Sequence, residues 1–131
     1  MGVRFPSAVT TVSVGIYGAT GAEALVLTTP PLTLPLDFAQ VFLFWWVAFN
    51  CGTGTTAVNT RIRRGPLITS QAFDPGLANA AVTANTIVSL CGCFLDTPGA
   101  VTGQQYSITL AGTGTTGAGN FQEGCMIAFC L

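Results

Sequence analysis

The chain contains no histidine and no lysine, and these absences exclude several kinds of chemistry. Without an imidazole base, Ser-His and Cys-His nucleophile arrangements cannot form. The spacings of the two close cysteine pairs, Cys91 with Cys93 and Cys125 with Cys130, do not match a zinc site, which usually includes histidine or two well-separated cysteine pairs. The five acidic residues show no spacing that indicates a shared catalytic site. We therefore expect a protein that is not an enzyme and that has no catalytic residues, no cofactor and no metal.

Charge is scarce: only 7% of the residues are charged, against about a quarter in ordinary globular domains. Four arginines are too few for a phosphate-binding surface, so we expect no nucleic-acid partner. Hydrophobic residues make up 50% of the chain, and its mean hydropathy is +0.61. A surface with so little charge tends to associate, which predicts an obligate oligomer or a lattice component. The alternative is a secreted Thr- and Gly-rich domain kept soluble by its hydroxyl groups.

Long hydrophobic runs are also missing. The longest, Val41 to Phe49, has nine residues, about half of what a membrane-spanning helix needs. Pro6 and neighbouring serines and threonines interrupt any apolar core of a signal peptide at the N-terminus. We therefore expect no membrane span, and synthesis and assembly in the cytoplasm.

The cysteines number five, so at least one thiol is free or pairs between chains. Cys91 and Cys93 would point the same way from one strand, where a bridge between them has poor geometry. Buried thiols that act as small hydrophobic side chains are the favoured interpretation. A disulfide between Cys91 or Cys93 and Cys125 is the alternative.

The segment from Gln40 to Cys51 is the most hydrophobic part of the chain. At a period of two, Val41, Leu43, Trp45, Val47 and Phe49 lie on one side, and Phe42, Phe44, Trp46 and Ala48 lie on the other. Both sides are apolar, so this strand should be covered on both faces. The segment from Asn85 to Leu95 has the same two-sided pattern, with Ile87, Cys91, Cys93 and Leu95 opposite Val88, Leu90, Gly92 and Phe94.

The remaining chain alternates short extended segments with turn signals every 8 to 12 residues, which is typical of a sandwich or barrel. With 131 residues, the chain is expected to form a single domain, residues 1–131. About eight antiparallel strands predict an all-β, single jelly-roll β-sandwich. Leu67 to Phe73 reads as extended, and Leu77 to Ala84 as one turn of helix at most.

Three of the arginines, Arg61, Arg63 and Arg64, lie close together in the sequence. In the segment VNTRIRR, Val58, Thr60 and Ile62 alternate with Asn59, Arg61 and Arg63, so these arginines should share the outward face. They could bind an acidic partner or the carboxylates of a neighbouring subunit, or they could line a solvated strand face. Asp96, in the turn Asp-Thr-Pro-Gly, is expected to cap backbone N–H groups.

The adjacent tryptophans Trp45 and Trp46 point in opposite directions, so at most one belongs to the domain's own core. The other is expected to be covered by a loop or a second subunit, as an anchor of the kind enriched at interface centres. Binding to sugar rings is the alternative.

Several segments resemble those of small phage and viral structural proteins. They are the R-x-R-R-G strand end at Arg61 to Gly65, the turn at Asp96 to Gly99, the strand Q-Y-S-I-T-L at Gln105 to Leu110, and the apolar last strand, CMIAFCL. These resemble capsid decoration, cement, spike or fibre-head domains with a single jelly-roll, tumour-necrosis-factor-like fold. The resemblance implies a homotrimer on or in a virion shell, with aromatic residues buried near each three-fold axis.

The sequence therefore predicts a virion structural protein, a homotrimeric capsid decoration or cement subunit or a small capsid protein, held by hydrophobic contacts. The expected partners are copies of itself and other capsid proteins. A receptor-binding or glycan-binding spike or fibre head, with a host-surface glycan as partner, and a self-assembling filament subunit are the alternatives. The oligomer-interface candidates are Phe42, Phe44, Trp45, Trp46, Arg61, Arg63, Arg64, Phe129 and Leu131.

Overall fold

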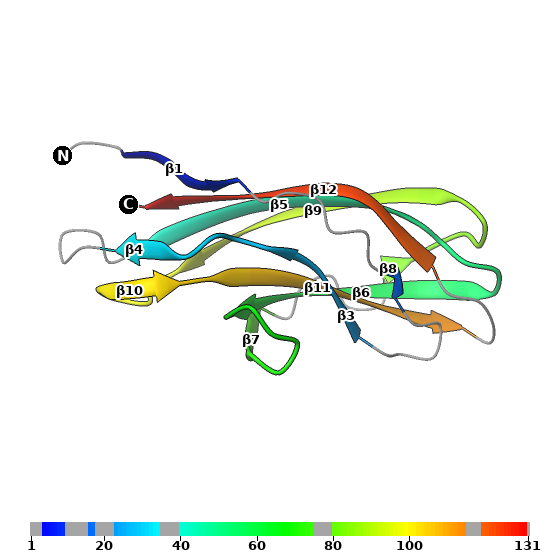
Figure 1. Ribbon diagram of the computed structural model, residues 1–131. Coiled ribbons are helices and arrows are strands. Elements are labelled where there is room, and N and C mark those ends of the chain that lie inside the picture. Colours follow the sequence, from blue (N-terminus) through cyan, green and yellow to red (C-terminus); the bar gives the residue numbers. More distant parts are fainter. Residues whose placement is uncertain are drawn as a thin grey trace.

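Two antiparallel β-sheets pack face to face in the computed structural model (Figure 1), which describes residues 4–9, 16–17, 23–34, 40–74, 80–114 and 119–130. The strands are β1 (Arg4–Val9), β2 (Ile16–Tyr17), β3 (Glu23–Thr28), β4 (Leu32–Leu34), β5 (Val41–Asn50), β6 (Thr55–Arg64), β7 (Gln71–Asp74), β8 (Ala80–Ala81), β9 (Ile87–Asp96), β10 (Val101–Gln104), β11 (Tyr106–Gly114) and β12 (Gly119–Cys130). The described part contains no helix, and every strand pair in it is antiparallel.

The first sheet has the strand order β1-β12-β5-β9, with β2 added at β12. The second has the order β3-β11-β6-β7, with β8 added at β6, and a two-stranded sheet pairs β10 with β4. Figure 1 shows the first sheet as the upper layer and the second as the lower layer. The all-β antiparallel sandwich predicted from the sequence is therefore confirmed.

The structure divides the predicted strands more finely, because short strands such as β4 and β10 pair at one end of the sandwich. Two local predictions were wrong. Residues 65–70 form bends and a turn before β7, so the segment from Leu67 to Phe73 is extended only at its end. Ala80 and Ala81 pair with β6 as β8, so that part of Leu77 to Ala84 is not helical, while residues 75–79 lie outside the described part.

The strand β5 lies inside the first sheet, between β12 and β9. Its odd-numbered residues share one side, as the period of two predicts, and the structure shows that this side is buried between the two sheets: Val41, Leu43, Trp45, Val47 and Phe49 are each at most 2% exposed. They pack against residues of the second sheet, among them Ile62, Tyr106 and Ile108, which are 0% exposed. Leu110 of β11 is also 0% exposed, so alternate residues of this strand face the core.

The turn after β6 depends on Gly65. Its φ angle is +131°, in the left-handed half of conformational space. A Cβ atom at this position would lie 2.4 Å from Ser70 Oγ, so a larger residue would displace the turn. The backbone carbonyl of Gly65 accepts a hydrogen bond from Ser107 Oγ at 2.7 Å, which ties the turn to β11.

Candidate functional site

The outward face of the first sheet is apolar across three strands. Residues directly opposite one another in an antiparallel pair point to the same face, so the strand register defines rows of side chains. Three successive rows cross β12, β5 and β9: Phe129–Phe42–Leu95, Ile127–Phe44–Cys93 and Cys125–Trp46–Cys91. We call these nine residues the outer apolar face.

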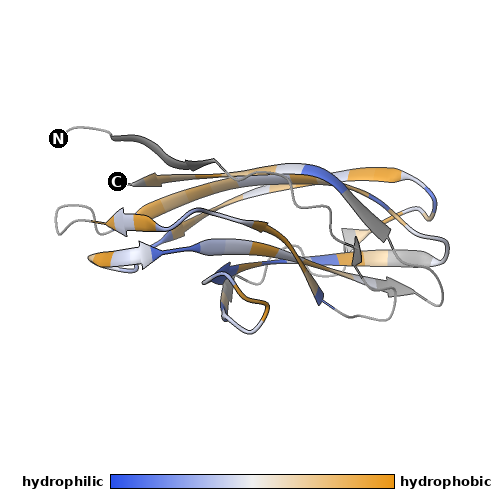
Figure 2. Cartoon of the chain, viewed as in Figure 1, coloured by the Kyte–Doolittle hydropathy of each residue, from blue (hydrophilic) through white to orange (hydrophobic). Residues whose placement is uncertain are grey.

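The outer apolar face is open to solvent in the isolated chain. Phe44 is 40% exposed and Leu95 is 47% exposed, and the remaining aromatic and aliphatic members are half-buried. Phe42 and Phe129 contact each other with ring centroids 6.3 Å apart. Figure 2 shows hydrophobic colour along much of β5 and along β9 and the C-terminal part of β12. Contiguous apolar surface of this kind marks an interaction site, because monomers seldom expose it.

Polar groups border the face at one end. The next row consists of Glu123, Ala48 and Ser89, of which Glu123 and Ser89 are exposed. An apolar centre with a polar edge is the usual composition of a protein–protein interface.

The two tryptophans separate as the alternation predicted. Trp45 is 2% exposed in the core, where it faces Gly92 across the β5–β9 pair. Trp46 lies half-buried on the outer apolar face. Trp45 therefore cannot contact another subunit, and of the two only Trp46 stays an interface candidate.

Four cysteines in the described part are free thiols: Cys51, Cys91, Cys93 and Cys125. The bridge from Cys91 or Cys93 to Cys125 is not formed, because β5 lies between the strands that carry them. Residues two strands apart are separated by about 10 Å, beyond the reach of a disulfide. Cys51 is buried, as expected for thiols that act as hydrophobic side chains, but Cys91 and Cys93 are exposed, which contradicts that expectation.

The opposite side of the sandwich, the outward face of the second sheet, is polar. Arg63 forms an ion pair with Glu23 of β3 and donates from Nη1 to the carbonyl oxygen of Ser70 at 2.6 Å. The other carboxylate oxygen of Glu23 accepts a hydrogen bond from Thr109 Oγ1. Arg63 does point outward, but its side chain is only 9% exposed because it lies against these partners. Its acidic partner in this structure, Glu23, belongs to its own chain, and contact with a carboxylate of a neighbouring subunit stays a prediction.

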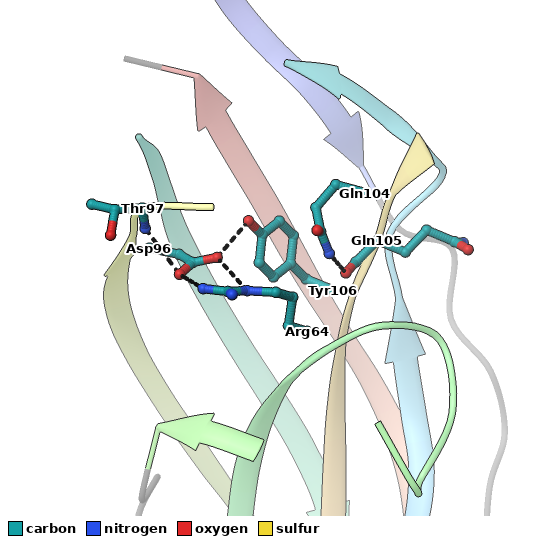
Figure 3. A network of polar contacts seen from close by, with 6 residues as sticks. All are labelled: Arg64, Asp96, Thr97, Gln104, Gln105 and Tyr106. Atoms are coloured by element: carbon teal, nitrogen blue, oxygen red, sulfur yellow. Dashed lines mark hydrogen bonds and ion pairs between the residues drawn. The ribbon is translucent and has the colours of Figure 1, made fainter. Parts of the chain in front are cut away.

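Arg64 joins the two sheets at one end of the sandwich (Figure 3). It forms an ion pair with Asp96 at the end of β9, and its Nε donates to Asp96 Oδ2 at 3.1 Å. The Tyr106 hydroxyl donates to the same oxygen at 2.7 Å. The predicted turn cap is confirmed, since the Thr97 backbone N–H donates to Asp96 Oδ1 at 2.9 Å. Arg64, like Arg63, has an acidic partner within its own chain.

The hydrogen bond to Asp96 raises the pKa of Arg64, with a further contribution from the negative charge of Asp96, while partial burial opposes the shift. A raised pKa in a cation means that its stabilising contribution is present at every pH below its ordinary pKa and is lost only above it. The guanidinium group of arginine keeps its proton, and so its charge, until the pH is far above neutral. Titration of Arg64 therefore does not change the contribution of the Arg64–Asp96 ion pair to stability anywhere in the neutral pH range.

Arg61 differs from its two neighbours. It is exposed, and no acidic partner contacts it among the described residues. With Glu23, Asn59 and Ala111, it lines a shallow hollow of about 150 Å³ on the polar side. This hollow offers a guanidinium group, an amide and a carboxylate, and it has no aromatic wall.

The predicted interface residues thus divide into groups. Four of them lie together on the outer apolar face: Phe42, Phe44, Trp46 and Phe129. Three make their contacts within the chain: Trp45, Arg63 and Arg64. Arg61 lies on the other side of the sandwich. Leu131 lies outside the described residues. The other five members are Ile127, Leu95, Cys91, Cys93 and Cys125, which the sequence prediction did not include among the interface candidates. The alternation of β9 and β12 was visible in the sequence, but the register that aligns them with β5 was not.

Other kinds of site find no support in the described part of the chain. No group of three or more Cys, Asp or Glu residues there could hold a metal ion. No helix there is long and apolar enough to cross a membrane.

The fold and this face together define a class: a jelly-roll β-sandwich with one apolar and one polar outer face. No protein-family model and no curated protein sequence matches the chain. Solved structures do share the fold. A chain of the infectious bursal disease virus Gx strain is similar with a TM-score of 0.67 at 10% identity, over 97% of this chain. VP2 in a subviral particle of the same virus gives a TM-score of 0.64 at 8% identity, also over 97% of this chain.

The chain spans only about a third of those viral proteins, covering 33% of each. The tumour necrosis factor Eiger from S. frugiperda is similar over nearly its whole length: the match covers 95% of this chain and 90% of Eiger, with a TM-score of 0.53 at 8% identity. At these identities the similarity shows the fold. The jelly-roll, tumour-necrosis-factor-like architecture expected from the sequence is therefore confirmed.

Proposed function

We propose that this chain is a non-enzymatic structural protein of a virion, and that it assembles as a homotrimer through its outer apolar face. The observation that carries the proposal is the continuous apolar surface across β12, β5 and β9, with Phe44 at its centre and Trp46 in the adjacent row. The similarity in fold to chains of infectious bursal disease virus particles supports the virion setting.

The composition of the outer apolar face favours contact with a second copy of the chain over exposure to water or binding of a sugar. Its nine members are aromatic, aliphatic or cysteine side chains, and none of them offers a carboxylate or an amide to orient sugar hydroxyls. The chain has few charges with which to keep such a surface solvated. Covering the face with another copy removes apolar area from water, which is the main favourable term in association.

A decoration or cement role follows from the difference between the two outer faces. A subunit that meets its own copies through an apolar face still presents its polar side, with Arg61, Asn59 and Glu23, to other surroundings. We propose that the trimer attaches to, and stabilises, a shell made of other capsid proteins. Assembly in the host cytoplasm and residence in the virion belong to this proposal.

The native mass of the purified chain tests the trimer. Light scattering after gel filtration should give three times the chain mass of 13.5 kDa. Phe44→Asp, which places a charge at the centre of the face, should weaken association by at least about 30-fold, the effect of losing a central interface anchor. Ile68→Asp is the matched control, because Ile68 is similarly exposed, at 46%, in the turn before β7 on the other sheet.

A stable monomer that shows no association at micromolar concentration would contradict the trimer. Equal effects of the two substitutions would contradict the assignment of the face. Open polymers seen by negative-stain microscopy would favour the filament subunit instead.

A glycan-binding head is the second candidate, and the hollow at Arg61 is the observation that favours it. Guanidinium, amide and carboxylate groups are the kinds of polar group that fix a small ligand in a site. If this candidate holds, Arg61→Ala should abolish binding on a glycan array while the native mass stays unchanged. No binding to any glycan by the unmodified chain would remove it.

A further inference from the structure

The exposed thiols have no function in the fold itself. Cys91 and Cys93 are exposed on β9, Cys125 is half-buried on β12, and all three belong to the outer apolar face. In a chain whose surface has little chemistry of any kind, three thiols on one face are an uncommon concentration of reactive groups. They lie in the two rows that contain Trp46 and Phe44, on the strands that flank β5 in the proposed interface.

These thiols cannot bridge within the chain. Cys125 is separated from the two β9 cysteines by β5, a distance of about 10 Å, whereas a disulfide needs Cα atoms within about 7 Å. Cys91 and Cys93 are about 7 Å apart on the same side of one strand, a poor geometry for a bridge. A disulfide between two of these three residues must therefore join two molecules.

We infer that Cys125 of one copy forms a disulfide with Cys91 or Cys93 of the next copy, and that these bonds close the trimer covalently. This inference rests on the proposed homotrimer. Symmetry selects the pairing: a bridge between two identical residues joins copies two at a time and leaves the third copy of a trimer unjoined. A bridge between two different residues is head-to-tail, so the same bond repeats around the three-fold axis and links all three copies.

The strand order suits such a head-to-tail bond. β9 is the last strand of its sheet among the described residues, so its thiols lie at the rim of the face, whereas β12 is an interior strand between β1 and β5. One copy can thus bring its rim against the interior of the neighbouring face. The outer apolar face carries a thiol at both of the positions that this contact needs.

Because the cytoplasm keeps thiols reduced, the bond forms once the assembled trimer reaches an oxidising environment outside the cell, by thiol–disulfide exchange with a small-molecule disulfide such as oxidised glutathione. The thiolate of one cysteine attacks a sulfur of that disulfide, which forms a mixed disulfide and releases one glutathione thiolate. The second cysteine, from the neighbouring copy, then attacks the mixed disulfide and releases the second glutathione. Two protein thiols are oxidised to one disulfide, and one molecule of oxidised glutathione is reduced to two thiols.

The experiment treats the purified full chain with oxidised glutathione and separates it by denaturing electrophoresis without reductant. We expect a covalent trimer that a reductant returns to single chains. Cys125→Ser should abolish the covalent species, and so should Cys91→Ser combined with Cys93→Ser. Cys51→Ala is the matched control, because Cys51 is 1% exposed in the core and should not contribute. Peptide mass spectrometry of the oxidised trimer should show Cys125 linked to Cys91 or Cys93.

Native mass in reducing buffer separates this inference from the proposal on which it rests. A trimer in reducing buffer that gives only single chains or covalent dimers after oxidation would overturn the disulfide and leave the trimer standing. Cross-links that map to other cysteines would overturn it in the same way. A monomer in reducing buffer would overturn the proposed trimer itself.

Discussion

At the scale of single residues, Trp45 and Gly92 make a tight contact between the neighbouring strands β5 and β9. The indole ring lies over Gly92, and a Cβ atom at that position would lie 2.8 Å from Trp45 Cζ2. No other residue type fits, because real Cβ atoms do not approach carbon this closely. The pair explains why a glycine interrupts the apolar β9 strand, where it otherwise weakens pairing.

We therefore predict that Gly92→Ala lowers the free energy of unfolding by about 1–3 kcal/mol, the usual cost of adding a methyl group to a packed core. The ring cannot swing away easily, since Trp45 is only 2% exposed. Thermal or urea denaturation followed by circular dichroism measures the change. Ser89→Ala, at an exposed position on the same strand, is the control and should stay within about 0.5 kcal/mol of the unmodified chain. Equal stability of Gly92→Ala would show that this contact is not tight.

At the scale of elements, the contact among Arg64, Asp96 and Tyr106 holds the end of β9 in one sheet to β6 and β11 in the other (Figure 3). Asp96 is 4% exposed, so its charge needs these partners. Hydrophobic burial in the core holds the two sheets together but does not depend on direction. The polar contact does depend on direction, so it fixes how the ends of the two sheets align.

We predict that Tyr106→Phe lowers the free energy of unfolding by about 1.5–3 kcal/mol, because it removes one hydrogen bond to a charged acceptor. Asp96→Ala should cost more than Tyr106→Phe, since it leaves both the hydroxyl and the guanidinium without their acceptor. Chemical denaturation measures both values. Thr102→Ala, at an exposed position on β10, should have little effect. A smaller loss for Asp96→Ala than for Tyr106→Phe would contradict the assigned contact.

At the scale of the whole molecule, the two outer faces of the sandwich differ in kind. The side that carries Glu23, Arg63 and Thr109 joins these side chains to one another within the chain, although the buried Nε of Arg63 has no hydrogen-bond partner among the described residues. The other side exposes the outer apolar face and offers few polar groups. Such a molecule is expected to gain part of its stability from association.

We predict that the melting temperature rises with protein concentration, because a ligand that binds only the folded state stabilises it, and here the ligand is another copy. Scanning calorimetry over a range of concentrations measures the slope. Phe44→Asp should remove the slope, and Ile68→Asp should keep it, because Ile68 lies outside the outer apolar face. A melting temperature that is independent of concentration in the unmodified chain would contradict association-linked stability.

The sequence by itself determined the fold class, which side chains along β5 share a side of the strand and the absence of imidazole-based chemistry. These properties depend on local alternation and on composition, and both can be read one residue at a time. It also showed that one tryptophan had to lie outside the core, because adjacent residues of a strand point in opposite directions.

Tertiary structure alone decided which tryptophan was inside, which arginines met which carboxylates, and which residues shared a face. Arg64 and Asp96 are 32 positions apart, and Arg63 and Glu23 are 40 apart, so no local pattern connects them. The three rows of the outer apolar face depend on strand register, which is set by pairing between distant segments. The physical reason is that alternation gives each strand two faces, but only packing of the second sheet against one of them determines which face stays open.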